Sequence, residues 1–130
     1  MEGVIHNFSF LKNINADKKI IFLIDDSHGM GITGIGGKGV IASLPRLNNV
    51  EYILTYSLSK AFNISGGAIG CSTKTSELIQ QNPNYTGSTA IAPSLIYAFI
   101  KSKNLYAQQR EKLFENINHI KKIIPSSHIK

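Results

Sequence analysis

Three short apolar segments between residues 20 and 71 have the pattern of β-strands. Ile20–Ile24 is a continuous run rich in β-branched residues, which is typical of a strand buried on both faces of a parallel sheet. Residues 52–56 predict a second strand by the same test, and residues 68–71 predict a shorter strand of small residues. An α/β sheet has about five or six strands on average. The pattern therefore indicates only part of such a sheet.

A helical period replaces this pattern after the third strand. Residues 72–81 predict a helix with Thr73 or Thr75 as its N-cap. From Pro93 onward apolar side chains recur at intervals of three and four, which predicts a long helical segment. Its second part carries an apolar stripe that should be buried against another surface. The stripe consists of Leu113, Ile117, Ile120 and Ile124.

Polar and titratable side chains directly follow the first two predicted strands. Residues 25–28 are Asp-Asp-Ser-His, and residues 57–60 are Ser-Leu-Ser-Lys. The carboxyl ends of neighbouring parallel strands meet at one edge of an open α/β sheet, and such sheets bind their ligands there. We therefore expect the functional site at this edge.

Six glycines occupy the eleven positions from 29 to 39. Gly29, Gly31 and Gly34 have the spacing of the dinucleotide-binding fingerprint, but that motif needs its first glycine against the strand end and a helix at the third. The Walker phosphate-binding pattern fails as well, because neither Ser nor Thr follows Lys38. The remaining interpretation is a long flexible loop whose backbone needs positive φ or a close approach to another surface.

Lys60 is the strongest candidate for reactive chemistry in the second cluster. Most lysines are surface charges, but an apolar strand directed inward would bring this amine into a dry environment. Loss of hydration favours the neutral, nucleophilic form of an amine. Three roles stay open from the residues alone: phosphate contact, Schiff-base nucleophile and surface charge.

Asp25 and His28 are three residues apart, and simple structural roles as a turn cap and a hydrogen-bonded histidine would explain each of them alone. An acid–base pair of Asp25 with Asp26 is disfavoured, because adjacent side chains leaving a strand usually point apart. A serine nucleophile assisted by His28 is also disfavoured, since the sequence around Ser59 is not that of a nucleophile elbow.

Composition and charge are those of an ordinary globular domain. The 130 residues are 42% hydrophobic and 17% charged, and 14 Lys and Arg against 8 Asp and Glu give a net charge of +6. The basic residues are scattered in ones and twos, without the stripe or aromatic platform that nucleic-acid binding favours. We expect neither nucleic acid nor a membrane as a partner.

Cysteine and histidine give no metal or disulfide signal. Cys71 is the single cysteine, which excludes an internal disulfide, and the four histidines lack ligand spacing, so we expect no metal. No apolar stretch reaches the roughly 18 residues of a membrane span, and the first ten residues do not resemble a signal peptide. The expected location is cytoplasmic.

Two segments together resemble a known enzyme family. Residues 22–39 (Phe-Leu-Ile-Asp-Asp-Ser-His-Gly and the glycine-rich run) and residues 57–67 (Ser-Leu-Ser-Lys-Ala-Phe-Asn-Ile-Ser-Gly-Gly) are similar, in sequence and in spacing, to the pyridoxal-phosphate-dependent α-oxoamine synthases. That family has the aminotransferase class I/II fold. The resemblance covers about residues 20–93. It implies an α/β fold, as a partial large domain of a fold-type I enzyme with a mostly parallel sheet flanked by helices.

The resemblance implies catalytic roles for three matching residues. Lys60 would bind pyridoxal 5'-phosphate covalently and then move protons at the substrate α-carbon. Asp25 would pair with the pyridine nitrogen of the cofactor, and His28 would hydrogen-bond its phenolic oxygen. These three residues would also bind the cofactor. Asn63 departs from the family, which commonly has glycine at this position.

Three hydroxyls are implied as contacts to the cofactor phosphate. Ser57 stands where the family usually has threonine. Ser88 and Thr89, in a predicted polar loop over residues 82–89, match a Ser-Thr pair that reaches the phosphate of a neighbouring subunit. The glycine-rich loop would lie near the interface of a homodimer.

The implied activity is that of a C-acyltransferase, in which an amino acid condenses with an acyl-CoA. An aminotransferase or lyase of the same fold would use the same cofactor residues, so both stay open. A non-catalytic remnant or interaction module is the alternative outside the enzymes. Retention of Asp25, His28 and Lys60 together argues against that alternative.

The resemblance also implies a fragment. Residues 1–93 would be a partial cofactor-binding large domain, residues 94–124 a long helical segment leading to a missing small domain, and residues 125–130 a truncated tail. The family's upstream half, which supplies a ring that stacks on the cofactor, has no counterpart here. The same holds for the downstream arginine that binds the substrate carboxylate.

Overall fold

The structure is a computed structural model, and it describes residues 5–124. The chain divides into two compact units, Met1–Ile91 and Ala92–Lys130, each with its own internal contacts. The tail expected at residues 125–130 lies outside the described residues.

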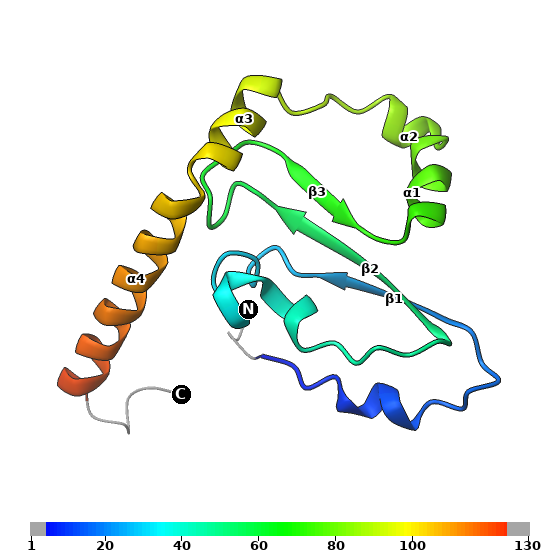
Figure 1. The fold of residues 1–130 in the computed structure, drawn as a ribbon, viewed down its shortest axis with the longest axis horizontal. Coiled ribbons are helices and arrows are strands. Elements are labelled where there is room, and N and C mark those ends of the chain that lie inside the picture. Colours follow the sequence, from blue (N-terminus) through cyan, green and yellow to red (C-terminus); the bar gives the residue numbers. More distant parts are fainter. Residues whose placement is uncertain (1–4, 125–130) are drawn as a thin grey trace. The chain divides into compact units, whose positions relative to one another are not determined.

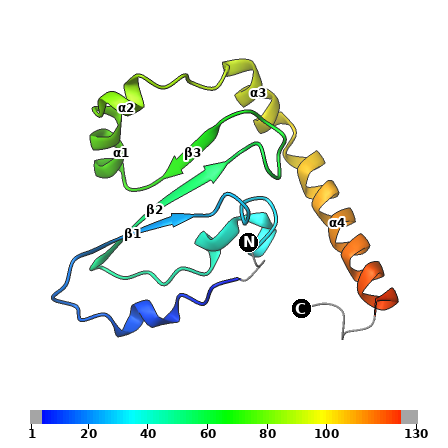
Figure 2. The same ribbon diagram turned by 180° about the vertical axis from the view of Figure 1, so that it is seen from behind.

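The first unit is built on a sheet of three strands in the order β1-β2-β3. The strands are β1 (Ile20–Asp25), β2 (Val50–Ser57) and β3 (Gly67–Gly70), and Figures 1 and 2 show them side by side from the front and from behind. All three predicted strands are confirmed. The continuous apolar runs identified the first two, but the expected burial on both faces was wrong for β1, whose residues are alternately half-buried and exposed.

The strand pairing follows from the lengths of the connections. β1 pairs with β2 in parallel, from Ile20 opposite Val50 to Asp25 opposite Thr55, and residues 26–49 provide the long crossover that a parallel pair requires. β2 pairs with β3 in antiparallel fashion, because the short connection at residues 58–66 can only reverse the chain. The α/β class is confirmed, and the described sheet is mixed.

The core of the first unit lies around β2 and its flanking loops. Among the described residues the buried hydrophobic side chains are Leu11, Val50, Leu54, Leu58 and Ile64. Leu11 belongs to a short 3-10 helix, Ser9–Asn13, and the rings of Phe8 and Phe10 near it lie 6.0 and 6.2 Å from the ring of Phe22 on β1. The segment before β1 thus packs on one face of the sheet.

Two helices follow β3 in the first unit, α1 (Thr73–Gln80) and α2 (Pro83–Thr86). The N-cap of α1 is Ser72, so the prediction of Thr73 or Thr75 was wrong: Ser72 has extended dihedral angles and its side chain accepts a hydrogen bond from the Thr75 amide at 3.2 Å. α2 lies within the predicted loop at residues 82–89, where Asn82 is its N-cap and proline its first residue.

The second unit consists of α3 (Pro93–Lys101) and α4 (Lys103–Ile123), and the rings of Phe99 and Tyr106 lie 5.6 Å apart across their junction. The predicted apolar stripe of α4 is not buried: Leu113 and Ile120 are 38% and 49% exposed. A stripe of this kind needs a second surface, and the described residues of the second unit do not provide one. No described helix combines the length and the apolarity required to cross a membrane.

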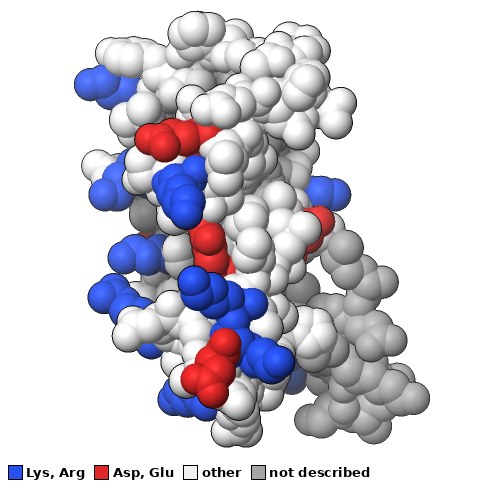
Figure 3. Space-filling model, turned by 90° about the vertical axis from the view of Figure 1, so that its right-hand side faces the viewer, with Lys and Arg blue, Asp and Glu red and all other residues white. Residues whose placement is uncertain are grey.

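Charged side chains are dispersed on the face shown in Figure 3. Lys and Arg occur there in small separate groups with Asp and Glu between them. This distribution agrees with the scattered basic residues of the sequence. A positive stripe of the kind that tracks a nucleic-acid backbone is not visible on that face.

Candidate functional site

Asp25 and Ser57 lie on the same face of the sheet, at the carboxyl ends of β1 and β2. Asp25 is opposite Thr55 in the parallel pair, and Ser57 follows Thr55 by two residues, so the alternation of side chains gives all three the same face. Asp25 is exposed and Ser57 is half-buried. The two strand ends therefore present a carboxylate and a hydroxyl to solvent at one edge.

The pKa of Asp25 responds to Ser27, His28 and Lys60. Asp25 Oδ1 accepts a hydrogen bond of 2.9 Å from the Ser27 amide. The side-chain and backbone hydrogen bonds of Ser27 lower the pKa of Asp25 below its ordinary 3.8, and the charges of His28 and Lys60 lower it further. The side chains of His28 and Lys60 therefore lie within electrostatic range of Asp25, and the lowered pKa keeps its carboxylate ionised at neutral pH.

Lys60 lies in the turn that follows β2 and is exposed. This position corrects the expectation that the strand would carry its amine into a dry environment. Leu58 takes the inward position instead: it is 5% exposed, and its amide donates to the Gly66 carbonyl at 3.0 Å. The hydroxyls of Ser57 and Ser59 flank this buried leucine and lie 2.7 Å apart. The turn therefore presents an accessible amine beside a pair of hydroxyls.

The glycine-rich loop over residues 29–39 is held together by backbone hydrogen bonds. Gly31 donates to the Gly37 carbonyl at 2.8 Å, and Gly39 donates to the Thr33 carbonyl at 2.9 Å. The predicted need for positive φ is confirmed at five of its glycines, Gly31, Gly34, Gly36, Gly37 and Gly39. The hydrogen bonds give the loop a defined form, in contrast to the loose segment that the sequence suggested.

Asn63 has a φ of 53° and is the non-glycine residue with positive φ among the described residues. Asparagine is one of the few residues that adopt this left-handed region without a large cost. The departure from glycine at this position therefore preserves the turn between Lys60 and β3.

Asp26 is a buried carboxylate, whereas the sequence had suggested it only as a disfavoured partner for Asp25. Its side chain is 7% exposed, and Oδ2 accepts a hydrogen bond of 2.8 Å from the Val40 amide. Burial raises the pKa of Asp26 above 3.8, the Val40 hydrogen bond lowers it, and the charge of Asp25 raises it again. The alternation of side chains leaving a strand could have identified this buried position.

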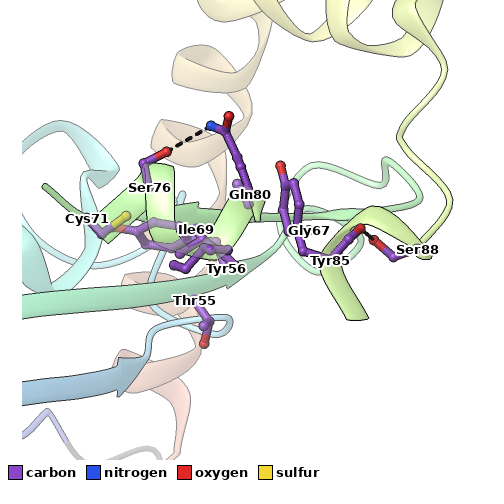
Figure 4. Close-up of a pocket in the computed structure, with 11 residues that line it drawn as sticks. Thr55, Tyr56, Gly67, Ile69, Cys71, Ser76, Gln80, Tyr85 and Ser88 are labelled. Carbon is purple, nitrogen blue, oxygen red and sulfur yellow. Dashed lines mark hydrogen bonds between the residues drawn. The ribbon is translucent and has the colours of Figure 1, made fainter. Parts of the chain in front are cut away.

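Ser88 and Thr89 belong to a different part of the first unit. Ser88 donates its hydroxyl to the Tyr85 carbonyl at 2.6 Å, and Thr89 is exposed. Ser88 borders a cavity of about 390 Å³ formed by residues of β2, β3, α1 and α2 (Figure 4). The cavity lining contains no Asp, Glu, His, Lys or Arg. We therefore locate the candidate site at the strand ends, and the predicted contact of Ser88 and Thr89 with a neighbouring subunit stays a prediction.

The chain belongs to the aminotransferase class I and II family, whose model matches residues 1–127. Over 124 residues it is 36% identical to the 8-amino-7-oxononanoate synthase of Buchnera aphidicola subsp. Baizongia pistaciae, covering 91% of this chain and 31% of that protein. The synthase of the same name from Nitrosomonas eutropha is 33% identical over 110 residues, which cover 80% of this chain and 28% of that protein. The chain thus spans about a third of the length of these relatives. No solved structure gives a significant match.

Proposed function

We propose that the chain supplies the cofactor-binding part of a pyridoxal-phosphate-dependent C-acyltransferase, which joins an amino acid to an acyl-CoA. The observation that carries this proposal is the grouping of Asp25, His28 and Lys60 at the carboxyl ends of β1 and β2. Relatives that share this part of the chain are named 8-amino-7-oxononanoate synthase, a name that describes an amino ketone product. In the overall reaction the amino acid loses carbon dioxide and the acyl thioester loses free CoA.

The residues at the strand ends fit the chemistry of pyridoxal phosphate. When bound, this cofactor supplies a ring that withdraws electrons from the substrate α-carbon. Asp25 is held ionised by Ser27, so it can stabilise a protonated ring nitrogen. His28 can hydrogen-bond the phenolic oxygen of the ring. The carboxylate of Asp25 thus has an imidazole and an amine in its electrostatic range, and these three groups match the polar atoms of the cofactor.

Lys60 would hold the cofactor covalently, since its amine is accessible and lies within electrostatic range of Asp25. The same amine would then remove and return a proton at the substrate α-carbon. The adjacent hydroxyls of Ser57 and Ser59 are suited to an anionic phosphate. Ser88 and Thr89 would reach the phosphate of a neighbouring subunit in a homodimer. We place this enzyme in the cytoplasm.

An aminotransferase is the second candidate, because the matching family model describes aminotransferases of classes I and II. Both activities need the same cofactor residues, and they differ in the second substrate. A C-acyltransferase releases free CoA from an acyl-CoA in the presence of an amino acid. An aminotransferase releases no CoA and instead transfers the amino group to a 2-oxo acid.

Borohydride trapping tests the cofactor site directly. The 130-residue chain is incubated with pyridoxal phosphate, reduced and digested, and the labelled peptide is identified by mass spectrometry. We expect one reduced adduct at Lys60 and its loss in Lys60→Ala. Lys38→Ala is the matched control, because Lys38 is also exposed and lies in the glycine-rich loop. Equal labelling of both lysines in the unsubstituted chain would contradict the proposal.

A further inference from the structure

Asp26 is a buried carboxylate that the proposed chemistry does not use. Its amide donates to the Thr55 carbonyl at 2.9 Å and so extends the pairing of β1 with β2 by one residue. Its side chain lies opposite to that of Asp25 and accepts the amide hydrogen of Val40 at 2.8 Å. Val40 follows the last glycine of the glycine-rich loop. The carboxylate therefore joins the end of β1 to the far end of that loop.

The carboxylate of Asp26 occupies space that is free because residues 29 and 39 are glycines. A Cβ on Gly29 would collide with Oδ1 of Asp26, and a Cβ on Gly39 would collide with Oδ2. Gly39 also has a φ of 73°, a conformation that side chains other than glycine rarely adopt. The loop is thus folded around the Asp26 side chain, and both of its terminal glycines contact it.

The main chain of Asp26 holds the near end of the same loop. Its carbonyl accepts hydrogen bonds from the amides of Gly29 and Met30, both at 3.0 Å. His28 lies in the turn that these two bonds close. One residue therefore anchors both ends of the loop, through its carbonyl at the near end and through its carboxylate at the far end.

We propose that Asp26 is a positioning residue of this site, whose side chain fixes the glycine-rich loop against β1 and thereby holds the turn that presents His28 beside Asp25. The proposal rests on the proposed function for the role of His28, whereas the anchoring of the loop is independent of any cofactor.

The proposed anchoring depends on the acceptor oxygen of Asp26 and not on its negative charge. Burial raises the pKa of Asp26, so the folded protein binds a proton at this group more tightly than the unfolded chain does. Ionised Asp26 therefore lowers the stability of the fold at neutral pH. An asparagine would keep an acceptor for the Val40 amide without this cost.

Three variants and a matched control separate positioning from simple stabilisation. Asp26→Ala removes the acceptor, and Asp26→Asn retains one. Gly39→Ala displaces the carboxylate from the other side. Gly36→Ala is the matched control, because Gly36 has a similar φ of 64° but no atom within 4 Å of an added Cβ. If the loop is anchored as proposed, Asp26→Ala and Gly39→Ala should behave alike, and Asp26→Asn should resemble the unsubstituted chain. Gly36→Ala should show only the backbone strain that a side chain at positive φ imposes on both glycine variants, and Gly39→Ala should exceed it.

The first measurement needs no cofactor. Amide hydrogen exchange should accelerate about tenfold or more at Val40 and Met30 in Asp26→Ala, while amides of β1 and β2 keep their protection. The ring NMR signals of His28 should move, whereas those of His6 and His119 should not. Asp26→Asn should restore both readouts. Equal acceleration in the strands and the loop would show a structural role only, and unchanged exchange at Val40 would overturn the anchoring itself.

The second measurement is trapping of pyridoxal phosphate at Lys60 in the same variants. In Asp26→Ala the fraction trapped should fall about tenfold, more than the fraction of unfolded protein explains, and it should recover in Asp26→Asn. Unchanged trapping together with accelerated exchange at Val40 would overturn the link to His28 and the cofactor. Absence of trapping in the unsubstituted chain would count against the proposed function, and the exchange data would still decide the anchoring.

Discussion

Asp25 and Asp26 are identical residues with opposite environments. Asp25 is exposed and accepts hydrogen bonds from Ser27, which lower its pKa, whereas burial dominates at Asp26 and raises its pKa. One step along the strand end changes the face of the sheet and therefore the dielectric surroundings of the carboxylate. This difference agrees with the proposed roles, ligand binding for Asp25 and support of the loop for Asp26.

The ionised state of Asp25 leads to a prediction for cofactor affinity. Asp25→Asn removes the negative charge that would face a protonated ring nitrogen, and a hydrogen bond to a charged group contributes about 1.5–3 kcal/mol. We therefore expect pyridoxal phosphate to bind roughly ten- to a hundredfold more weakly. A spectroscopic titration of the 130-residue chain measures this change. Asp17→Asn, in an exposed loop, is the control and should leave the affinity unchanged.

The sequence predicted that the clusters with Asp25, His28 and Lys60 follow two neighbouring parallel strands, and the parallel pairing of β1 with β2 is confirmed. Strand alternation also argued correctly against an acid–base pair of Asp25 and Asp26. The exposure of Lys60 could not be predicted, since it depends on Leu58 filling the inward position of the turn. The hydrogen bond from Val40 to Asp26 spans fourteen residues, and no local pattern encodes a contact of that range.

At the scale of elements, the start of α1 is held by a network of side chains. The Ser72 hydroxyl accepts the Thr75 amide at 3.2 Å and donates to Oε1 of Glu51 at 2.6 Å. The Thr75 hydroxyl also donates to Oε1 of Glu51. The first turn of α1 is therefore attached to the second residue of β2.

Removal of the cap should loosen α1 selectively. Ser72→Ala eliminates the acceptor for the Thr75 amide, and loss of an N-cap costs about 1 kcal/mol. Hydrogen exchange of the Thr75 and Ser76 amides should accelerate accordingly, with little change in β1. Thr73→Ala is the matched control, because Thr73 is the first helical residue and takes no part in the network. Equal effects of the two substitutions would contradict Ser72 as the cap.

The same network predicts a response to pH. Hydrogen bonds from Ser72 and Thr75 lower the pKa of Glu51 below its ordinary 4.5, with a smaller contribution from Lys74. The folded state thus favours the ionised form, so the stabilisation is complete above pH 4.5 and is lost as the pH falls through the lowered pKa. Protection of α1 amides should decline in that acidic range. Glu51→Gln should remove the pH dependence, and persistence of the decline would assign it to another carboxylate.

Element types were predicted more reliably than their pairing or their ends. Continuous apolar runs identified β1 and β2, and the three-four period identified α3 and α4. The antiparallel direction of β3 depends on the length of its connection, which hydrophobic periodicity does not report. α2 is a single turn within a polar segment, too short for its period to be recognised.

At the scale of the whole molecule, much apolar surface of the described residues lacks cover. Ile21 and Leu23 alternate with the half-buried residues of β1, and each is 67% exposed. They share the face of Asp25 by strand alternation. An exposed apolar patch on the face of a terminal strand promotes association with other surfaces. Relatives about three times as long have additional chain that could cover such a face.

Self-association of the 130-residue chain should therefore depend on this face of β1. The double substitution Ile21→Thr with Leu23→Thr places β-branched residues suited to a strand at both positions but removes apolar area, and each buried side chain of this size contributes about 1.5–3 kcal/mol. We expect the concentration at which dimers or larger species form in sedimentation to rise at least about tenfold. Leu113→Glu on α4 tests the other exposed stripe. If only Leu113→Glu prevents association, the self-association surface is on α4 and not on β1. If neither variant prevents association, these exposed apolar side chains do not drive it.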